Sequence, residues 1–157
     1  MGDETLALIK PDAVIRYHVG IVLTEIELRG FNIAECKLVT RYQGQDGSLN
    51  ALARNRFIVF YEEHKGKPFF DPLVDFMASG PFYALRLTKP LFPQADVVAD
   101  WRTAMGSASL ASREPGTIRY KHTRPGDPLY WNLVHGSDSA EAVERELNLA
   151  YRWGWLL

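Results

Sequence analysis

Four short apolar or alternating runs, separated by stretches with helical periodicity, most constrain what this chain can fold into. Residues 5–9 (TLALI) are continuously apolar, as in a central strand, and residues 31–41 alternate like a half-buried strand. Residues 82–87 form a third run, and a fourth ends at His135. With the helices between them, the order is β-α-β-(α-α)-β-α-β. This order predicts an α+β fold of the ferredoxin-like sandwich kind, with a four-stranded antiparallel sheet and helices packed on one face.

The predicted helices are recognised by apolar stripes at helical spacing. Gly30 is placed to end the first helix, and Pro68 suits the first turn of a later one. Asp138, with Glu141 three residues later, resembles a capping box that opens the last helix. The stripes are Val19, Val22, Leu23 and Ile26; Phe57, Phe60, Tyr61 and His64; Phe70, Leu73, Val74 and Met77; Val97, Trp101, Ala104 and Met105; and Val143, Leu147, Ala150 and Tyr151.

The bulk composition is that of one ordinary globular domain, which we expect to span residues 1–157. A formal net charge of -1 gives no reason to expect nucleic acid or a membrane surface as a partner, and we expect neither a signal peptide nor a membrane span. Cys36 is the only cysteine, which excludes an internal disulfide and fits a reducing, cytoplasmic location. Because Cys36 shares its side of the strand with Ala34 and Leu38, we expect it to be a buried structural thiol.

Two stretches lack periodicity. Residues 43–50 (QGQDGSLN) are polar and glycine-bearing, and predict a loop. Residues 106–131 are rich in turn formers, and an ordered loop of this length in a compact domain is usually functional. This second stretch carries several basic residues, so a solvated basic loop is the alternative; they are Arg113, Arg119, Lys121 and Arg124.

The stretch NLVHGSDS at residues 132–139 predicts a strand that ends and a helix that begins, with His135 at the junction. A histidine there can act as a nucleophile or general base near neutral pH, because its unperturbed pKa lies near 6.5. The alternative is a partly buried histidine bonded to the backbone, and this residue alone does not decide between them.

Other candidates are single charged or aromatic residues at the ends or margins of predicted elements. Lys10 ends the first strand, Arg102 lies beside Trp101, and Glu146 lies at the margin of the last helical stripe. Phe69 lies off its apolar stripe, so it can project outward and stack on a base. The alternatives are a solvated chain end for Lys10, an ordinary exposed phenylalanine for Phe69 and a surface ion pair for Glu146.

Five segments together resemble the nucleoside diphosphate kinase family over nearly the whole chain. Their order matches the family, and the sequence at residues 5–14 and 75–81 is most similar to a divergent branch of it. The segments are LIKPD at 8–12, KPFF at 67–70, MASGP at 77–81, PGTIR at 115–119 and NLVHGSDS at 132–139.

The resemblance implies a ping-pong phosphoryl transfer. His135 takes the γ-phosphate of a nucleoside triphosphate such as ATP, becomes phosphohistidine, and passes the group to a diphosphate such as GDP. Glu146 orients the imidazole, and Ser137 supports Glu146. The family also implies Mg²⁺ held mainly by the substrate phosphates with few or no protein ligands, and a homo-oligomer. Its phosphate and sugar site falls on Lys10, Tyr61, Arg102, Arg119 and Asn132, and its base site on Phe69, with Leu73 and Leu129 nearby.

Elementary chemistry is consistent with these roles. Phosphoryl transfer spreads charge over oxygens, so cations that position and stabilise the phosphates do most of the work. Arginine forks match phosphate geometry, and a carboxylate behind an imidazole fixes its orientation and tautomer. Stacking on an aromatic ring reads every base alike, which predicts a site indifferent to base identity.

The chain departs from the family pattern near its basic loop. Where the family has a phosphate-binding threonine this chain has Ala108, so that hydroxyl is missing unless Ser107 or Ser109 substitutes for it. The expected Gly-Asp after Arg119 is Tyr120-Lys121. These departures leave a second hypothesis open, a nucleotide-binding or interaction module with little turnover. A metal-binding protein is poorly supported, since the histidines show no ligand spacing; they are His18, His64, His122 and His135.

Overall fold

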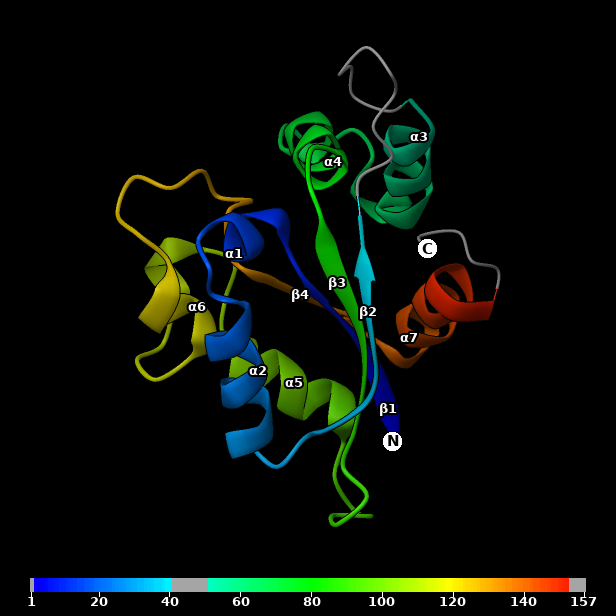
Figure 1. The fold of residues 1–157 in the computed structure, drawn as a ribbon, viewed down its shortest axis with the longest axis vertical. Helices are drawn as coiled ribbons and strands as arrows, with labels where there is room; N and C mark the ends of the chain where they lie inside the picture. Colours follow the sequence, from blue (N-terminus) through cyan, green and yellow to red (C-terminus); the bar gives the residue numbers. More distant parts are fainter. Residues whose placement is uncertain (1, 41–50, 153–157) are drawn as a thin grey trace.

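The predicted four-stranded antiparallel sheet is present in the computed structural model, which describes residues 2–40 and 51–152 (Figure 1). The strand order is β2-β3-β1-β4, so β1 and β3 are central. The loop predicted at residues 43–50 lies outside the described residues. The strands are β1 (Glu4–Ile9), β2 (Asn32–Val39), β3 (Phe82–Thr88) and β4 (Val134–Gly136).

The helices follow the predicted order, with several short additions. The α-helices are α1 (Pro11–Ile15), α2 (Val19–Leu28), α3 (Ala51–Phe60), α4 (Phe70–Ala78), α5 (Val97–Met105), α6 (Ile118–His122) and α7 (Ala140–Leu147). Two 3-10 helices, η1 (Glu62–His64) and η2 (Leu110–Ser112), and a π-helix, η3 (Asn148–Arg152), complete the set. None of the helices in the described ranges is long and apolar enough to cross a membrane.

Helices cover both faces of the sheet, so the prediction of helices on one face is wrong (Figure 1). Leu6 and Leu8 of β1 pack with α3, α4 and α7, whereas Ala7 and Ile9 pack with α2 and α5. Successive strand residues point to opposite faces, and all four of these side chains are fully buried. A continuously apolar strand therefore needs a helical layer on each side.

The predicted burial of Cys36 is also wrong, because its side chain is exposed. β2 is an edge strand and its face is only partly covered, so Leu38 on the same side is 50% exposed. Alternation with charged residues showed which residues share a side of the strand. It could not show whether a helix reaches far enough to cover that side.

Three element boundaries differ from the sequence predictions. The stripe that included His64 is broken, because α3 ends at Phe60 and His64 belongs to η1. The residue that caps α7 is Ser139, whose hydroxyl accepts a hydrogen bond from the amide of Ala142, and Asp138 lies before it. The stretch at 106–131 holds η2 and α6, both too short to give a periodic pattern.

Sheet register determines where His135 lies. His135 pairs with Leu8, and its side chain emerges on the face that carries α7. The next residue, Gly136, faces α5 so closely that an added Cβ would lie 2.4 Å from the Trp101 ring. The Trp101 indole donates to the carbonyl of His135 at 3.3 Å. β4 is thus pressed against α5 directly beside the histidine.

Candidate active site

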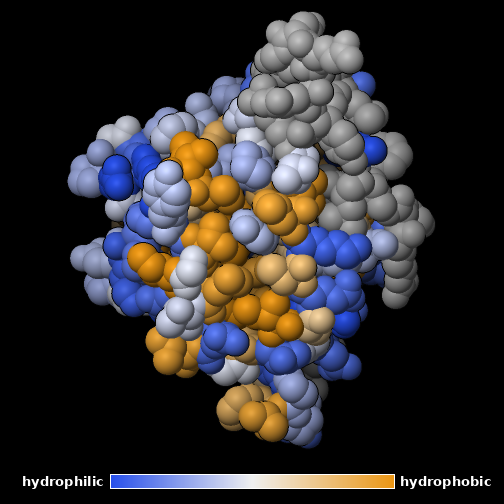
Figure 2. Space-filling view, in the orientation of Figure 1, coloured by the Kyte–Doolittle hydropathy of each residue, from blue (hydrophilic) through white to orange (hydrophobic). Residues whose placement is uncertain are grey.

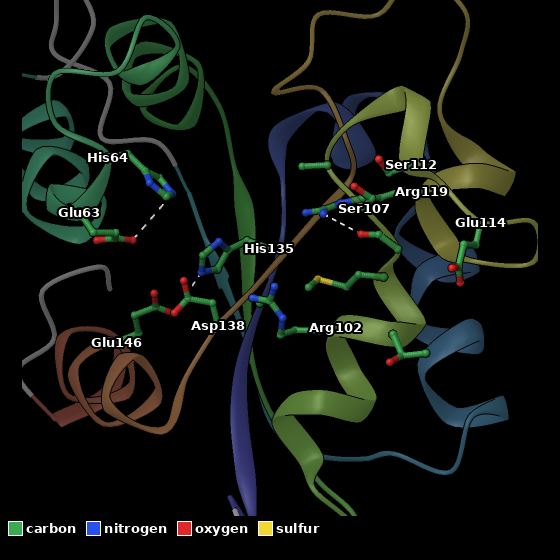
Figure 3. A pocket seen from close by; sticks show the side chains of 15 residues that line it. Glu63, His64, Arg102, Ser107, Ser112, Glu114, Arg119, His135, Asp138 and Glu146 are labelled. Atoms are coloured by element: carbon green, nitrogen blue, oxygen red, sulfur yellow. Dashed lines mark hydrogen bonds and ion pairs between the residues drawn. The ribbon is translucent and has the colours of Figure 1, made fainter.

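Two cavities meet at His135. The polar cavity, of about 660 Å³, is lined by Arg102, Ser107 and Asp138 among others (Figure 3). The apolar cavity, of about 260 Å³, is lined by Lys10, Tyr61, Phe69, Leu73, Leu129 and Asn132 among others. His64, Ala108, Arg119 and His135 line both.

His135 is held from behind by a buried carboxylate. Its Nε2 lies 3.1 Å from Oε2 of Glu146, and the Ser137 hydroxyl donates to the same oxygen at 2.7 Å. Glu146 and Ser137 are almost fully buried, whereas the His135 side chain is 16% exposed. Because a carboxylate only accepts hydrogen bonds, Nε2 carries the proton. Nδ1 makes no hydrogen bond with any described residue, and its lone pair is free in the neutral ring.

Lys10 follows β1 directly and reaches the loop that precedes β4. Its ammonium donates to Oδ1 of Asn132 at 3.0 Å and to the carbonyl of Tyr130. The side chain is 3% exposed. Burial lowers the pKa of Lys10 to about 7, against the opposing charge of Asp12. A lysine with such a pKa is poised to take up a proton when an anion binds beside it.

Arg119, on α6, is tied to the backbone of the segment that carries His135. Its guanidinium donates to the carbonyls of Asn132 at 3.3 Å, Val134 at 2.6 Å and Gly106 at 2.9 Å. Burial lowers the pKa of Arg119 to about 10, so it remains a cation at neutral pH. Three of the five N–H groups serve these carbonyls, which leaves two for a ligand.

Arg102 contributes a second guanidinium from α5. Figure 3 shows its side chain reaching from the helix toward His135. It makes no hydrogen bond or ion pair with any residue in the described part of the chain, unlike Arg119. The two guanidinium groups make the wall of the polar cavity basic, which suits phosphate oxygens.

Aromatic and apolar side chains frame the other side of the histidine. The Tyr61 ring meets His135 edge-on at 5.5 Å, and burial raises the pKa of Tyr61, so its hydroxyl stays protonated. Phe69 is 39% exposed and Leu129 50% exposed at the apolar cavity, while Leu73 is buried. Exposed apolar surface beside a cavity can take the flat face of a base.

A strained residue aligns the loop between the lysine and the histidine. Leu133 has a φ of 72°, an unusual conformation for a bulky side chain. Its amide donates to Oδ2 of Asp12 at 3.0 Å, and its carbonyl accepts from the amide of Lys10 at 2.8 Å. Asp12 is fully buried, and burial raises its pKa. These bonds clamp the residues after β1 onto the residues before β4.

The basic loop is held in place by two further charged groups. The Arg113 guanidinium donates to the carbonyls of Ser107 at 3.1 Å and Ala108 at 3.0 Å. On the other side of α6, the buried Glu25 of α2 pairs with Lys121. The Glu25–Lys121 pair thereby fixes α6 to α2, and Arg119 with it.

Ten of the eleven predicted site residues line one or both cavities, and the eleventh, Ser137, lies behind Glu146. Sequence reasoning missed His64, which lines both cavities, and Asp138, which lines the polar one. It had placed His64 on a core stripe, and the turn signal Lys65-Gly66 just after it was the clue that the helix had already ended. For the missing hydroxyl it left Ser107 and Ser109 open. Ser107 lines the polar cavity, whereas Ser109 binds the Ser107 hydroxyl through its amide at 3.1 Å.

The arrangement brings an imidazole with a free nitrogen next to fixed cations and a stacking surface. Such a site can transfer a charged group to and from the imidazole while the cations stabilise oxygen charge. The carboxylate behind the ring stabilises the charge that forms on it.

Comparison with known proteins identifies the family of this chain. The model of the family "Nucleoside diphosphate kinase" matches residues 3–153. The nucleoside diphosphate kinase of Halalkalibacterium halodurans is 34% identical over 149 residues, covering 95% of this chain and 88% of the relative. That of Caldanaerobacter subterraneus subsp. tengcongensis is 38% identical over 150 residues, covering 94% and 92%.

Solved structures give the same result. The apo crystal structure of nucleoside diphosphate kinase from Encephalitozoon cuniculi has a TM-score of 0.78 and 27% identity, and covers 96% of this chain and 89% of that one. The Halobacterium salinarum enzyme, solved in complex with CDP, has a TM-score of 0.77 and 32% identity, and covers 100% and 92%. The chain therefore belongs to the nucleoside diphosphate kinase family.

Proposed function

We propose that this protein is a nucleoside diphosphate kinase that works by a ping-pong mechanism through phosphohistidine at His135. The observation that carries the proposal is the engagement of Nε2 by the buried Glu146 carboxylate, because it leaves Nδ1 free beside the basic wall of the polar cavity. Membership of the family, and the names of its relatives, support the same activity.

In the first half-reaction, Nδ1 of His135 attacks the γ-phosphorus of a nucleoside triphosphate. The bond from that phosphorus to the β,γ-bridging oxygen breaks, and the diphosphate leaves with the bond's electrons. In the second half-reaction, a terminal oxygen of another diphosphate attacks the phosphorus and the imidazole is released. Glu146 stabilises the positive charge on the ring, while Arg102 and Arg119 stabilise the equatorial oxygens.

The nucleoside would occupy the apolar cavity. Phe69 would stack on the base, with Leu73 and Leu129 beside it, and these contacts make no demand on base identity. Lys10 and Asn132 would bind the sugar and the adjacent phosphates. Ser107 would supply the hydroxyl that Ala108 lacks.

Magnesium would enter with the substrate. Among residues 2–40 and 51–152 no group of three or more acidic, cysteine or histidine side chains could hold a metal ion. Such a site fits an ion that is bound mainly by phosphate oxygens and water, as Mg²⁺ prefers. The Asp138 carboxylate, on the wall of the polar cavity, would offer such an ion a protein oxygen. When bound, the ion neutralises phosphate charge; positioning and proton control remain with the side chains described above.

We further propose that the protein is a homo-oligomer. Figure 2 shows apolar side chains gathered on the face formed by α2 and β2. The exposed large apolar side chains on these two elements are Ile21, by 43%, Leu28, by 79%, and Leu38, by 50%, and β2 is an edge strand of the sheet in the described ranges. An open edge beside an apolar patch suits a second copy of the chain. Leu38→Lys should lower the mass measured by sedimentation if this face is the contact, and an unchanged mass would reject it.

A second candidate function is a nucleotide-binding module with little turnover. It is favoured by Ala108, which lines both cavities without a hydroxyl. Initial rates with ATP and a second nucleoside diphosphate distinguish the two functions. A ping-pong kinase gives parallel double-reciprocal lines, whereas a binding module binds both nucleotides and gives no transfer.

A further inference from the structure

Arg16 and Asp127 form a bidentate ion pair that ties the end of α1 to the loop between α6 and β4 (Figure 1). Two guanidinium nitrogens each donate to one carboxylate oxygen at 2.7 Å, across 111 positions of sequence. Each side chain is only 12% exposed. Hydrogen bonds from Arg16 lower the pKa of Asp127, so the carboxylate stays ionised. Fork geometry and partial burial distinguish this pair from an ordinary surface ion pair.

The Asp127 carboxylate also closes the turn in which it lies. Its Oδ2 accepts a hydrogen bond from the amide of Arg124 at 2.9 Å, and the amide of Asp127 donates to the carbonyl of Arg124 at 3.2 Å. Pro125 and Gly126 occupy the centre of the turn, and Gly126 has a φ of 86°, as a type II turn needs. Arg16 therefore grips a closed turn of the backbone and not a free side chain.

The same guanidinium packs on Trp131 at the other end of the loop. The central carbon of the Arg16 guanidinium lies 5.0 Å from the centre of the Trp131 ring. That ring stacks in turn on Phe76 of α4, with 5.7 Å between the ring centres and 30° between the planes. The amide of Trp131 donates to the carbonyl of Pro128 at 2.8 Å. Arg16 thus holds the loop both at residue 127 and at residue 131.

Between these two points lie Leu129 and Tyr130, which both line the apolar cavity. The carbonyl of Leu129 accepts a hydrogen bond from the Asn132 amide group at 3.1 Å, and the carbonyl of Tyr130 accepts one from the ammonium of Lys10. The ion pair itself lines neither cavity at the histidine. It can therefore act on a bound nucleotide only through the loop.

We propose that Arg16 is a positioning residue for the nucleoside. Through its ion pair it holds the loop at residues 124–131 as a preformed wall of the apolar cavity, where Leu129 and Tyr130 meet the base. The proposal rests on the proposed kinase function. A ligand binds only the fraction of molecules in which its site is formed, so a wall that is formed in one molecule in ten weakens apparent binding about tenfold.

The phosphate end of the site is held by other elements. Arg102 lies on α5 and Arg119 on α6, and the guanidinium of Arg119 binds carbonyls of residues 106, 132 and 134, outside the loop. Loss of the ion pair should therefore weaken contact with the base and leave transfer from a bound nucleotide intact. A merely structural role would instead slow transfer and weaken the binding of every ligand.

The test measures kcat and KM with ATP and GDP for the wild type, Arg16→Gln, Asp127→Asn and the double variant. Asparagine at residue 127 keeps an oxygen for the amide of Arg124, so the turn remains and the ion pair is lost. We expect KM to rise about tenfold for both nucleotides in each single variant, while kcat changes by less than about twofold. The double variant should lose no more than either single one, because all three remove the same interaction.

Arg86→Gln is the matched control for these measurements. Arg86 also binds two carboxylate oxygens, those of Glu4 at 3.0 Å and Glu35 at 2.8 Å, and it lines neither cavity. It should leave both kcat and KM at their wild-type values. A kcat that falls as far as KM rises in Arg16→Gln would overturn the proposal.

A second readout separates the base from the phosphates without turnover. The dissociation constant for ADP should rise about tenfold in Arg16→Gln. That for pyrophosphate, which has no base to meet the wall, should change by less than about twofold when measured by competition with ADP. Equal weakening of both ligands, or wild-type affinity for ADP, overturns the proposal.

The binding measurements also keep the two proposals apart. If the wild type binds ADP but transfers no phosphate, the kinase function fails, and the two dissociation constants still decide the role of Arg16. If Arg16→Gln does not fold, the same constants measured on Asp127→Asn decide it, because that change lies in a loop and keeps the turn.

Discussion

The ammonium of Lys10 donates to the side-chain oxygen of Asn132 at 3.0 Å, across 122 positions of sequence. This bond joins the end of the first strand to the start of the last one, where the two cavities meet. It holds a lysine that burial has brought close to losing its proton.

Nucleotide binding should take up protons at Lys10. The pKa of Lys10 is lowered to about 7, so at pH 8 most of these side chains are neutral in the free protein. A bound phosphate favours the ammonium, and most of one proton should be taken up at pH 8 but little at pH 6. Calorimetry of ADP binding in buffers of different ionisation enthalpy measures this uptake. Lys10→Met should abolish it, and equal uptake in both proteins would contradict the role of Lys10.

The carboxylate behind the histidine should act on chemistry more than on binding. In Glu146→Gln an amide replaces the group that stabilises the charged ring, and we expect single-turnover phosphorylation to fall by about 10²- to 10³-fold. The dissociation constant for nucleotide should change by less than about threefold, because Glu146 lies behind His135. Glu144→Gln, exposed on the same helix, is the control. A variant with normal phosphorylation would remove Glu146 from the mechanism.

The hydroxyl of Ser107 should stand in for the one that Ala108 lacks. Ser107 lines the polar cavity, and its hydroxyl oxygen accepts a hydrogen bond from the amide of Ser109. The hydroxyl proton is therefore free to donate to a phosphate. Loss of a hydrogen bond to a charged group predicts a rate about tenfold lower or more in Ser107→Ala. Ser109→Ala should have no such effect. Equal rates in the two variants would show that this chain works without the hydroxyl.

The ion pairs of Glu25, which hold α6 to α2, should make the free energy of unfolding depend on pH in the acid range. Burial raises the pKa of Glu25, but hydrogen bonds from Lys121, Arg29 and His122 outweigh it and bring the pKa to about 2. A lowered pKa in the folded state gives stability that is fully present above about pH 4.5 and lost as the pH falls toward 2. Urea unfolding of Glu25→Gln should show a loss of about 2 kcal/mol at pH 7 and 5 that shrinks below pH 4.5.

The neighbouring Glu27→Gln is the control for this measurement, because Glu27 is exposed on the same helix. It should change the free energy of unfolding by less than about 0.5 kcal/mol. A loss in Glu25→Gln that does not vary with pH would mean that packing, and not charge, accounts for it.

Local pattern was enough to predict the strands and the junction at His135. The apolar run at 5–9 and the sequence around His135 and Gly136 could be interpreted locally, because the existence of a strand and the place where it ends depend on a few neighbouring residues. The fold class followed from the order of these runs, and the antiparallel four-stranded sheet confirms it.

What the sequence could not predict depends on contacts between distant segments. Arg119 is fixed by carbonyls from residues 106, 132 and 134, and no spacing within α6 reveals them. The exposure of Cys36 depends on β2 being at the edge of the sheet. The place of His64 at both cavities depends on the end of α3, and helix ends are the least certain part of a periodic pattern.

The most direct test of the central claim is the intact mass of the protein after incubation with ATP and Mg²⁺. Phosphoryl transfer through His135 predicts one acid-labile phosphoryl group on the chain, absent from His135→Ala and removed by added GDP. No adduct on a protein that binds ATP normally, or an adduct that persists in His135→Ala, would contradict the claim.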